Sequence, residues 1–394
     1  MSYYYDIGDI MKRFMLVFII FIILSLLVIN DKDERIYSDI EKKELRAVFI
    51  SYIELNNYVK GKSRKASKSN IDNMIKNIKK SKFNVIILQI RSHNDAIYRS
   101  DMFKVSDSIV LDNGSHYDIL NYFQKKCLEN NIDLFAWMNP YRIGKEENIS
   151  RREWIDTTNI QRVGDVYYYN PASREVQNYL VDAVREVVKN YNIHALLFDD
   201  YFYPLEDIDE VEYYDYLREN AFVTKEDFHL MMVNNFIRNV YKTVKEEKSE
   251  VLFGISPEGN IDNNYSKNYA DVRTWTSESG YIDFIMPQLY YGFFNSSRPY
   301  YDTLKEWNNM IKNDNILLFV ALSFYKVGMI DNYAKEGYYE WINNNDIIKR
   351  QILVARSYDK YRGFSLFRYD NLFNEDNKND NTSLELSNVI NILE

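Results

Sequence analysis

Eight short apolar segments recur along the chain from residue 45 onward. Nearly continuous hydrophobicity over so few residues is what a β-strand requires when both of its faces are covered. Helical patterns lie between the segments; within 171–191, for example, Val176, Leu180 and Val187 mark one apolar stripe. Eight βα units in about 330 residues predict an α/β fold, a (β/α)8 TIM barrel over residues 45–394. The segments are LRAVFISYI, NVIILQIR, IDLFAWMN, HALLFDD, VLFGISP, YIDFIMPQLYY, ILLFVALSFY and RGFSLFRY.

Capping signals predict where some of the helices begin. Asn170 before Pro171 is a start signal for the helix ending near residue 191, since proline suits the first helical position. Thr224 and Asp227 resemble a capping pair that opens a long helix to about residue 248. The C-terminal segment carries an apolar stripe suited to the eighth barrel helix, namely Leu384, Leu386, Val389, Ile390, Ile392 and Leu393. By contrast, the basic segment 56–70, NNYVKGKSRKASKSN, is expected to be a solvated loop.

The connections between these elements are unequal in length. Those from helix to strand are short, such as SKF, NN, YN and SE, whereas those from strand to helix are long. Insertions tolerated at random would lengthen both ends alike, so the asymmetry predicts a large cleft at the strands' C-terminal ends, where barrel enzymes build their sites. The long connections are 92–115, 139–169, 201–223, 257–268, 289–300 and 323–345.

The N-terminal region predicts a membrane anchor. Residues 14–29 form an apolar run that falls between the length of a signal-peptide core and that of a spanning helix. No small-residue cleavage site follows, so we expect an uncleaved signal anchor, with 1–13 held in the cytoplasm by Lys12 and Arg13. Residues 30–44 read as a charged linker, and the barrel is expected to lie outside a single-pass cell-membrane anchor.

Composition excludes several classes of function. The net charge of −9 argues against a nucleic-acid partner, because no basic excess is available to neutralise phosphates. The single Cys127 excludes an internal disulfide framework and a cysteine-based zinc site. Of the four histidines, only His93 falls near the predicted cleft, whereas a catalytic metal needs clustered ligands. We therefore expect no metal and no cofactor.

Polar and aromatic residues gather at the predicted strand ends. Carboxylates, amides, an arginine and aromatic rings around one cleft suit a carbohydrate, because rings stack on sugar faces while acids and amides bind hydroxyl groups. Glycoside cleavage then needs a protonated and an ionised group at the bond. The candidate catalytic residues are Asp199, Asp200 and Glu258, and the candidate substrate-binding residues are Arg91, His93, Asp95, Trp137, Asn139, Arg142, Tyr201, Tyr203, Asn260, Gln288 and Tyr290.

Five of these strand ends resemble a known family. LQIRSHNDAIY, FAWMNPYR, ALLFDDYFYP, FGISPEGN and DFIMPQLYYGF are similar, in this order, to motifs of the glycosyl hydrolase-like family 10 group of bacterial envelope proteins. The resemblance covers about residues 45–370. It implies a (β/α)8 barrel that hydrolyses cell-envelope glycans, with peptidoglycan strands as the substrate of some members. It also implies a pocket lined by Asp95, Asn139, Arg142, Asp199, Asp200, Gln288 and Tyr290; Glu258 departs from the family, where an uncharged residue is common.

The residues leave the catalytic roles open. Adjacent strand residues face opposite ways, so we expect one aspartate of the pair to face the sugar and the other to brace a loop or a neighbouring arginine. Repulsion between Asp199 and Asp200 would raise one pKa toward the range of a general acid, and Asp200 is the preferred acid. The second group is Glu258, Asp95 or the acetamido group of an N-acetyl sugar. The structural alternative is an aspartate pair that caps a helix or binds a cation, and the functional alternative is a carbohydrate-binding barrel without turnover.

Overall fold

A computed structural model describes residues 43–220 and 222–393, and Leu45–Glu394 forms one compact unit. The predicted cytoplasmic segment, the predicted anchor at 14–29 and all but the last two residues of the predicted linker lie outside the described residues. Among the described helices, none combines the length and the apolar character that crossing a membrane requires.

The eight predicted strands form one closed parallel barrel, so the TIM-barrel prediction is confirmed. Neighbouring strands follow the order β1-β13-β12-β11-β10-β9-β5-β2, and β2 pairs in turn with β1. The barrel is closed by the pairing of its first and last strands along the chain, β1 and β13. Parallel pairing places every strand's C-terminal end at the same face of the barrel. The strands are β1 (Leu45–Ile50), β2 (Val85–Arg91), β5 (Asp133–Met138), β9 (Ala195–Phe198), β10 (Leu252–Ile255), β11 (Phe284–Ile285), β12 (Leu317–Leu322) and β13 (Tyr361–Leu366).

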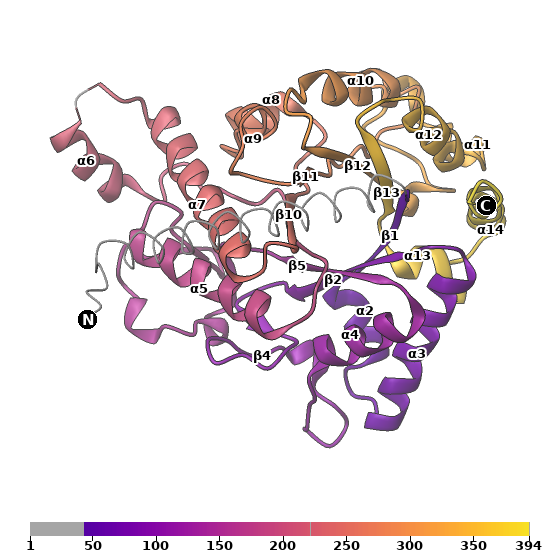
Figure 1. The fold of residues 1–394 in the computed structure, drawn as a ribbon, viewed down its shortest axis with the longest axis horizontal. Helices are drawn as coiled ribbons and strands as arrows, with labels where there is room; N and C mark the ends of the chain where they lie inside the picture. Colours follow the sequence, from indigo (N-terminus) through magenta and orange to yellow (C-terminus); the bar gives the residue numbers. More distant parts are fainter. Residues whose placement is uncertain (1–42, 221, 394) are drawn as a thin grey trace, which may run out of the picture. The chain divides into compact units, whose positions relative to one another are not determined.

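Helices surround the barrel, as Figure 1 shows for α3, α4, α5 and α7 and, across the strands, for α10, α12 and α14. Apolar faces of the strands and helices meet in one continuous buried cluster. This agrees with the prediction that the strands are covered on both faces. The helices are α2 (Tyr52–Tyr58), α3 (Arg64–Lys80), α4 (Ile119–Asn130), α5 (Arg174–Asn190), α6 (Glu210–Glu219), α7 (Lys225–Glu247), α8 (Ile261–Ser266), α9 (Val272–Trp275), α10 (Tyr300–Met310), α11 (Glu340–Asn343), α12 (Ile347–Ala355), α13 (Tyr369–Phe373) and α14 (Asp380–Ile390).

The structure corrects two local predictions. The helix expected to start at Pro171 begins at Arg174, because the Ser173 hydroxyl accepts from the backbone N–H of Val176 and so supplies the N-cap. Segment 56–70 is mostly helical rather than a loop, since Ser63 caps α3 in the same way. The cap by Thr224 is confirmed for α7.

The C-terminal stripe and the unequal connections are also found. In α14 and just beyond it, Val389 and Leu393 are buried, whereas Leu384 is 50% exposed and does not belong to the buried face. The connection from β5 to α5 is long enough to hold a small antiparallel sheet of β6 (Arg142–Gly144), β8 (Val166–Tyr169) and β7 (Ile160–Val163). That from β2 to α4 holds the short pair β3 (Asp95–Ala96) and β4 (Lys104–Val105).

Residues alternate along the strands between the helix layer and the barrel interior. In the interior, the Phe284 ring packs between Phe135 and Phe319, at centroid distances of 5.8 and 5.2 Å. Gly254 on the neighbouring strand makes room for this ring, because a Cβ there would lie 2.3 Å from a Phe284 ring carbon. The filled interior closes the barrel beneath the strands' C-terminal ends.

This packing gives the first prediction. Gly254→Ala should lower the free energy of unfolding by about 1–3 kcal/mol, as overpacking a filled core does. Urea unfolding followed by circular dichroism measures the change. In a Phe284→Leu background the same substitution should be much less damaging, because the two residues are in contact and their effects are not additive. Equal losses of unfolding free energy in both backgrounds would show that the Phe284 ring does not limit the space for a side chain at position 254.

Candidate active site

A pocket of about 520 Å³ opens at the strands' C-terminal ends. Residues from all eight barrel strands or from the loops that follow them line it. The cleft predicted from the connection lengths therefore exists. Its lining residues are Phe49, Ser51, Tyr52, Ile53, Gln89, Trp137, Asn139, Arg142, Leu197, Asp199, Asp200, Tyr201, Ser256, Gln288, Tyr290, Tyr325, Met329, Phe367, Arg368 and Asn371.

A chain of amides holds Asp199 in place. The Asn139 side-chain amide donates to Asp199 Oδ2, and Gln89 Nε2 donates to Asn139 Oδ1 at 2.7 Å. Gln89 Oε1 in turn accepts from the backbone N–H of Tyr52 at 3.1 Å. Because a backbone N–H can only donate, it fixes the orientation of both amides and directs a donor at the carboxyl group. This amide chain joins the ends of β1, β2, β5 and β9.

Asp200 is held from the opposite direction. Gln288 Nε2 donates to Asp200 Oδ1 at 3.2 Å and to the Ser256 carbonyl at 3.0 Å, which links the ends of β9, β10 and β11. Both aspartates line the pocket, because β9 ends at Phe198 and the chain turns before strand alternation would send Asp200 outward. We expected only one aspartate to face the pocket while the other braced a loop or an arginine; instead both line the pocket, and the side-chain amides of Asn139 and Gln288 bind them.

Both carboxyl groups have raised pKa values. Burial, and then the charge of Asp200, hold the pKa of Asp199 well above its usual range, while the Trp137 and Asn139 side chains act in the opposite direction. Burial raises the pKa of Asp200 to about 6; its own backbone N–H and Gln288 lower it, and the charge of Glu258 raises it. The expected repulsion is present, but removal from water is the larger cause.

Aromatic rings form the walls of the pocket. Phe49 packs edge-on against Trp137 and contacts Phe367, both at 5.5 Å, and Tyr290 lies 5.9 Å from Tyr325 between ring centroids. Tyr201 differs from these rings because it remains 64% exposed at the pocket mouth. Buried and half-buried rings together with one exposed ring suit a ligand with flat apolar faces and polar edges, such as a sugar.

The two arginines of the pocket have different surroundings. Arg368 donates to the buried Glu54 and lies 3.6 Å from Asp370 Oδ2, so its charge is balanced within the protein. Arg142, on β6, makes no side-chain hydrogen bond or ion pair with any residue in 43–220 or 222–393. The charge of Asp200, followed by burial, raises the pKa of Tyr201 to about 12, and the positive charge of Arg142 acts in the opposite direction.

Six of the sequence-predicted site residues lie outside the pocket lining. Arg91 is fully buried and donates to the carbonyls of Asn139 and Pro140 and to Asn94 Oδ1, so it supports the loop after β5. His93 packs behind Tyr52 at 5.4 Å, and Asp95 accepts from the backbone N–H of His93.

The other three residues stabilise loops. Tyr203 is buried and donates to Asp209, against the ring of His229. Glu258 Oε1 accepts from Asn263 at 2.7 Å, and Asn260 caps α8 by accepting from the backbone of Asp262. The remaining eight predicted residues come together in the pocket: Trp137, Asn139, Arg142, Asp199, Asp200, Tyr201, Gln288 and Tyr290.

None of the candidate catalytic or substrate-binding residues came from β1 or from the loop after β13. Phe49, Ser51, Tyr52 and Ile53 follow one another along the chain, while Phe367, Arg368 and Asn371 come from the other end of the sequence. Barrel closure brings the two groups together through the pairing of β1 with β13. A rule that every barrel strand contributes to the site would have pointed to them.

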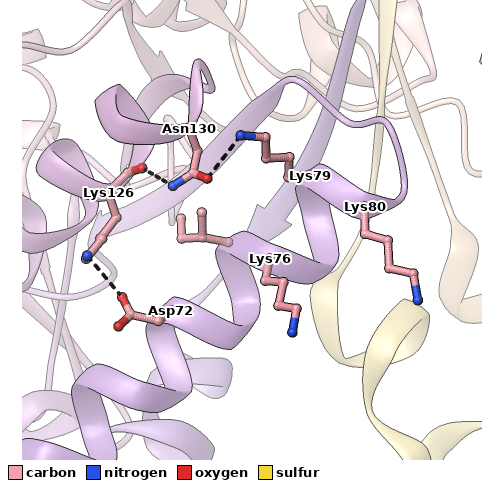
Figure 2. Close-up of a pocket in the computed structure, with 7 residues that line it drawn as sticks. Asp72, Lys76, Lys79, Lys80, Lys126 and Asn130 are labelled. Carbon is pink, nitrogen blue, oxygen red and sulfur yellow. Dashed lines mark hydrogen bonds and ion pairs between the residues drawn. The ribbon is translucent and has the colours of Figure 1, made fainter.

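A second depression, of about 330 Å³, lies on the flank between α3 and α4 and has another character. Four lysines line it together with Asp72, Ile75 and Asn130, and it contains no aromatic ring. Figure 2 shows Lys126 paired with Asp72 and Lys79 bonded to Asn130, while Lys76 and Lys80 project without a partner among the residues drawn. No group of three or more His, Cys, Asp or Glu side chains within the described ranges could hold a metal ion.

A closed parallel barrel with an aspartate pair in an aromatic pocket defines the class of glycoside hydrolase-like barrels. The chain belongs to the Glycosyl hydrolase-like 10 family, whose model matches residues 44–340. The protein therefore belongs to the family that its strand-end motifs resemble.

Known proteins agree with this assignment. Glycosyl hydrolase YngK of Bacillus subtilis is 30% identical over 367 residues, covering 84% of this chain and 69% of the relative. Glycosyl hydrolase DigH of Escherichia coli K12 is 28% identical over 329 residues, covering 73% and 72%. The glycoside hydrolase domain of PgaB (BpsB) from Bordetella bronchiseptica shares the fold at a TM-score of 0.57 and 11% identity, over 87% of this chain and 98% of that domain.

The raised pKa of Asp200 predicts how stability depends on pH. A carboxyl group with a raised pKa stabilises the fold most below its unfolded value, and this contribution is lost as the pH rises through about 6. Asp200→Asn should therefore increase the free energy of unfolding at pH 8 by about 1–3 kcal/mol and change it little at pH 4.

Urea midpoints of both proteins at the two pH values measure this effect. Asp112→Asn, at an exposed position, is the control and should change neither value. A substitution at Asp200 that destabilises equally at both pH values would contradict the assignment of a desolvated carboxyl group.

Proposed function

We propose that the protein is a membrane-anchored, extracytoplasmic glycoside hydrolase that acts on peptidoglycan glycan strands. The observation that carries the proposal is the aspartate pair in the pocket, with the pKa of Asp200 raised to about 6. A general acid works best when its pKa lies near the working pH, because it is then protonated and still releases its proton. The family membership and the aromatic pocket support a glycan as the ligand.

The arrangement of carboxylates favours one mechanism. Among the described residues that line the pocket, only Asp199 and Asp200 bear carboxyl groups, and they are consecutive in the chain. A two-carboxylate mechanism requires groups on both sides of the scissile bond, about 5–5.5 Å apart for retention or 6.5–9.5 Å for inversion. Glu258 does not line the pocket, and its role is to raise the pKa of Asp200 through its charge.

The substrate then supplies the second group. The acetamido oxygen of an N-acetyl sugar attacks the anomeric carbon while Asp200 gives its proton to the leaving glycosidic oxygen. Asp199, held by Asn139, contacts the acetamido group. A water molecule next attacks the same carbon, Asp200 takes the water's proton, and the bond between the carbon and the acetamido oxygen breaks. The acetamido group is thereby restored, and the sugar leaves with its configuration retained.

A carbohydrate-binding barrel without turnover is the second candidate. The observation that favours it is the same absence of a carboxylate on the far side of the described pocket. Such a protein would use the rings and amides to hold a glycan, and the aspartates would act only as hydrogen-bonding groups. The two candidates differ in what the protein does to the covalent structure of the glycan.

The first functional prediction concerns Asp200→Asn. The full chain should produce new reducing ends from peptidoglycan strands, with and without their peptides, while Asp200→Asn should lose at least about 100-fold in rate. Mass spectrometry of the products measures both, and Asp112→Asn is the control.

The proposed mechanism also predicts a pH dependence and a substrate requirement. The value of kcat/KM should fall above pH 6, because Asp200 then loses its proton. Strands whose acetamido groups have been removed should not be cut.

Other outcomes separate the alternatives. Cleavage of deacetylated strands would exclude assistance by the substrate while leaving the hydrolase assignment intact. Glycan binding by both proteins without cleavage of any strand would establish the binding barrel instead.

A separate prediction concerns the anchor. Removal of residues 1–29 should transfer the protein from the membrane to the soluble fraction, because no apolar segment of comparable length would remain. Sedimentation after washing with high salt measures the distribution, since the wash removes proteins held by charge alone. If the full chain were equally soluble, the proposed anchoring would be wrong.

A further inference from the structure

Positive charge is concentrated in one part of this acidic protein. Residues 43–82 contain eleven lysines and arginines against three carboxylates, whereas the whole chain has 49 against 58. Most of these cations lie on α3 or at its ends. They form what we call the basic strip: Lys62, Lys65, Lys68, Lys76, Lys79, Lys80 and Lys82, with Lys126 of α4 beside them.

The strip follows one face of the helix. Lys65, Lys68, Lys76 and Lys79 lie three or four residues apart or a multiple of that spacing, so they share a face. The opposite face is buried through Ile71, Met74, Ile75 and Ile78. A helix of 17 residues is about 25 Å long, which is the length of the strip.

Most cations of the basic strip have no ionic partner within residues 43–220 and 222–393. Lys62, Lys65, Lys76, Lys80 and Lys82 are exposed and make no side-chain hydrogen bond or ion pair with any described residue. The only carboxylate on this face of α3, Asp72, is bound by the Tyr122 hydroxyl and lies 3.8 Å from Lys126. The favourable interaction of Lys79 and Lys80 with the C-terminal end of α3 explains their presence, but not that of Lys65 or Lys76.

Aromatic rings contact the cations at the N-terminal end of α3. Lys68 lies over the rings of Tyr117 and Tyr122, at 5.6 and 5.1 Å, and Arg64 lies 5.1 Å from the Tyr117 ring. Toward the C-terminal end of α3, Lys76, Lys79, Lys80 and Lys126 surround the depression of about 330 Å³ between α3 and α4, as Figure 2 shows. The strip is therefore a shaped surface and not only a set of scattered charges.

The strip runs along the barrel's flank and is separate from the pocket. Only residues 81–84 separate α3 from the start of β2, so Lys80 and Lys82 lie toward the strands' N-terminal ends. The pocket opens at the C-terminal ends. A polymer bound along α3 would consequently leave the pocket free.

We infer that the basic strip binds a linear phosphodiester polymer of the cell envelope, such as a poly(polyol phosphate). Repeated single negative charges along a flexible chain match a row of lysines about 25 Å long, and such a chain can enter the depression between α3 and α4, which a flat membrane surface would not fill. The polymer would concentrate the protein on its glycan substrate. This inference rests on the extracytoplasmic location in the proposed function, but it does not need turnover.

Binding to isolated cell walls tests the inference. The full chain in detergent should bind walls that retain their phosphate polymers, and Lys65→Gln/Lys76→Gln/Lys80→Gln should weaken that binding about tenfold or more near 0.1 M salt, with a shallower dependence on salt concentration. The matched control is Lys189→Gln/Lys267→Gln/Lys305→Gln, which removes the same charge from exposed lysines elsewhere. It should bind as the wild type does.

Further measurements separate this inference from the proposed function. Purified poly(glycerol phosphate) should compete for wall binding, and acid-stripped walls should bind wild type and triple variant alike. The triple variant should cut short soluble glycan strands at the wild-type rate, because its pocket is intact. Equal binding of walls by the wild type and the triple variant would overturn the inference. Binding to phosphatidylglycerol vesicles is measured in parallel. If the triple variant lost binding to these vesicles but not to walls, the strip would be assigned to the membrane instead.

Discussion

Two carboxyl groups withdrawn from water at the end of one strand are the constraint around which the pocket is organised. Neither aspartate has an arginine beside it; each is held by an amide, Asp199 by Asn139 and Asp200 by Gln288. An ion pair would keep both groups ionised, whereas neutral amides bind them while burial keeps their pKa values high. A group that must give up a proton near neutral pH requires that environment.

The amide chain also explains why the pocket needs a closed barrel. Hydrogen bonds link the ends of β1, β2, β5 and β9 on one side of the pair, and those of β9, β10 and β11 on the other. All of these bonds join neighbouring strands except the one from Gln288 to Asp200, which reaches from the end of β11 past β10 to the end of β9. The interior rings below, with Phe284 beside Gly254, fill the barrel and keep water from reaching the pair from beneath.

The molecule separates its charges between two regions. Around the pocket, Arg368 is balanced by Glu54, and Arg142 alone remains without an ionic partner among the described residues. On α3 and at its ends, by contrast, five exposed lysines make no side-chain hydrogen bond or ion pair with the part of the chain that the structure describes. The pocket thus selects through shape, rings and a few directed donors, while the basic strip acts through charge density. The two surfaces can be altered independently.

The sequence by itself determined the barrel, because eight buried parallel strands must each be a short apolar run and the helices between them must each carry an apolar stripe. It also indicated which end holds the site and eight of the residues that line it. The tertiary structure decided the rest. Arg91, His93, Asp95, Tyr203, Glu258 and Asn260 are polar residues at strand ends like the others, and only their partners in space show that they hold loops. Closure between β1 and β13 brought in Tyr52 and Arg368 from opposite ends of the chain, and no local pattern records such a contact.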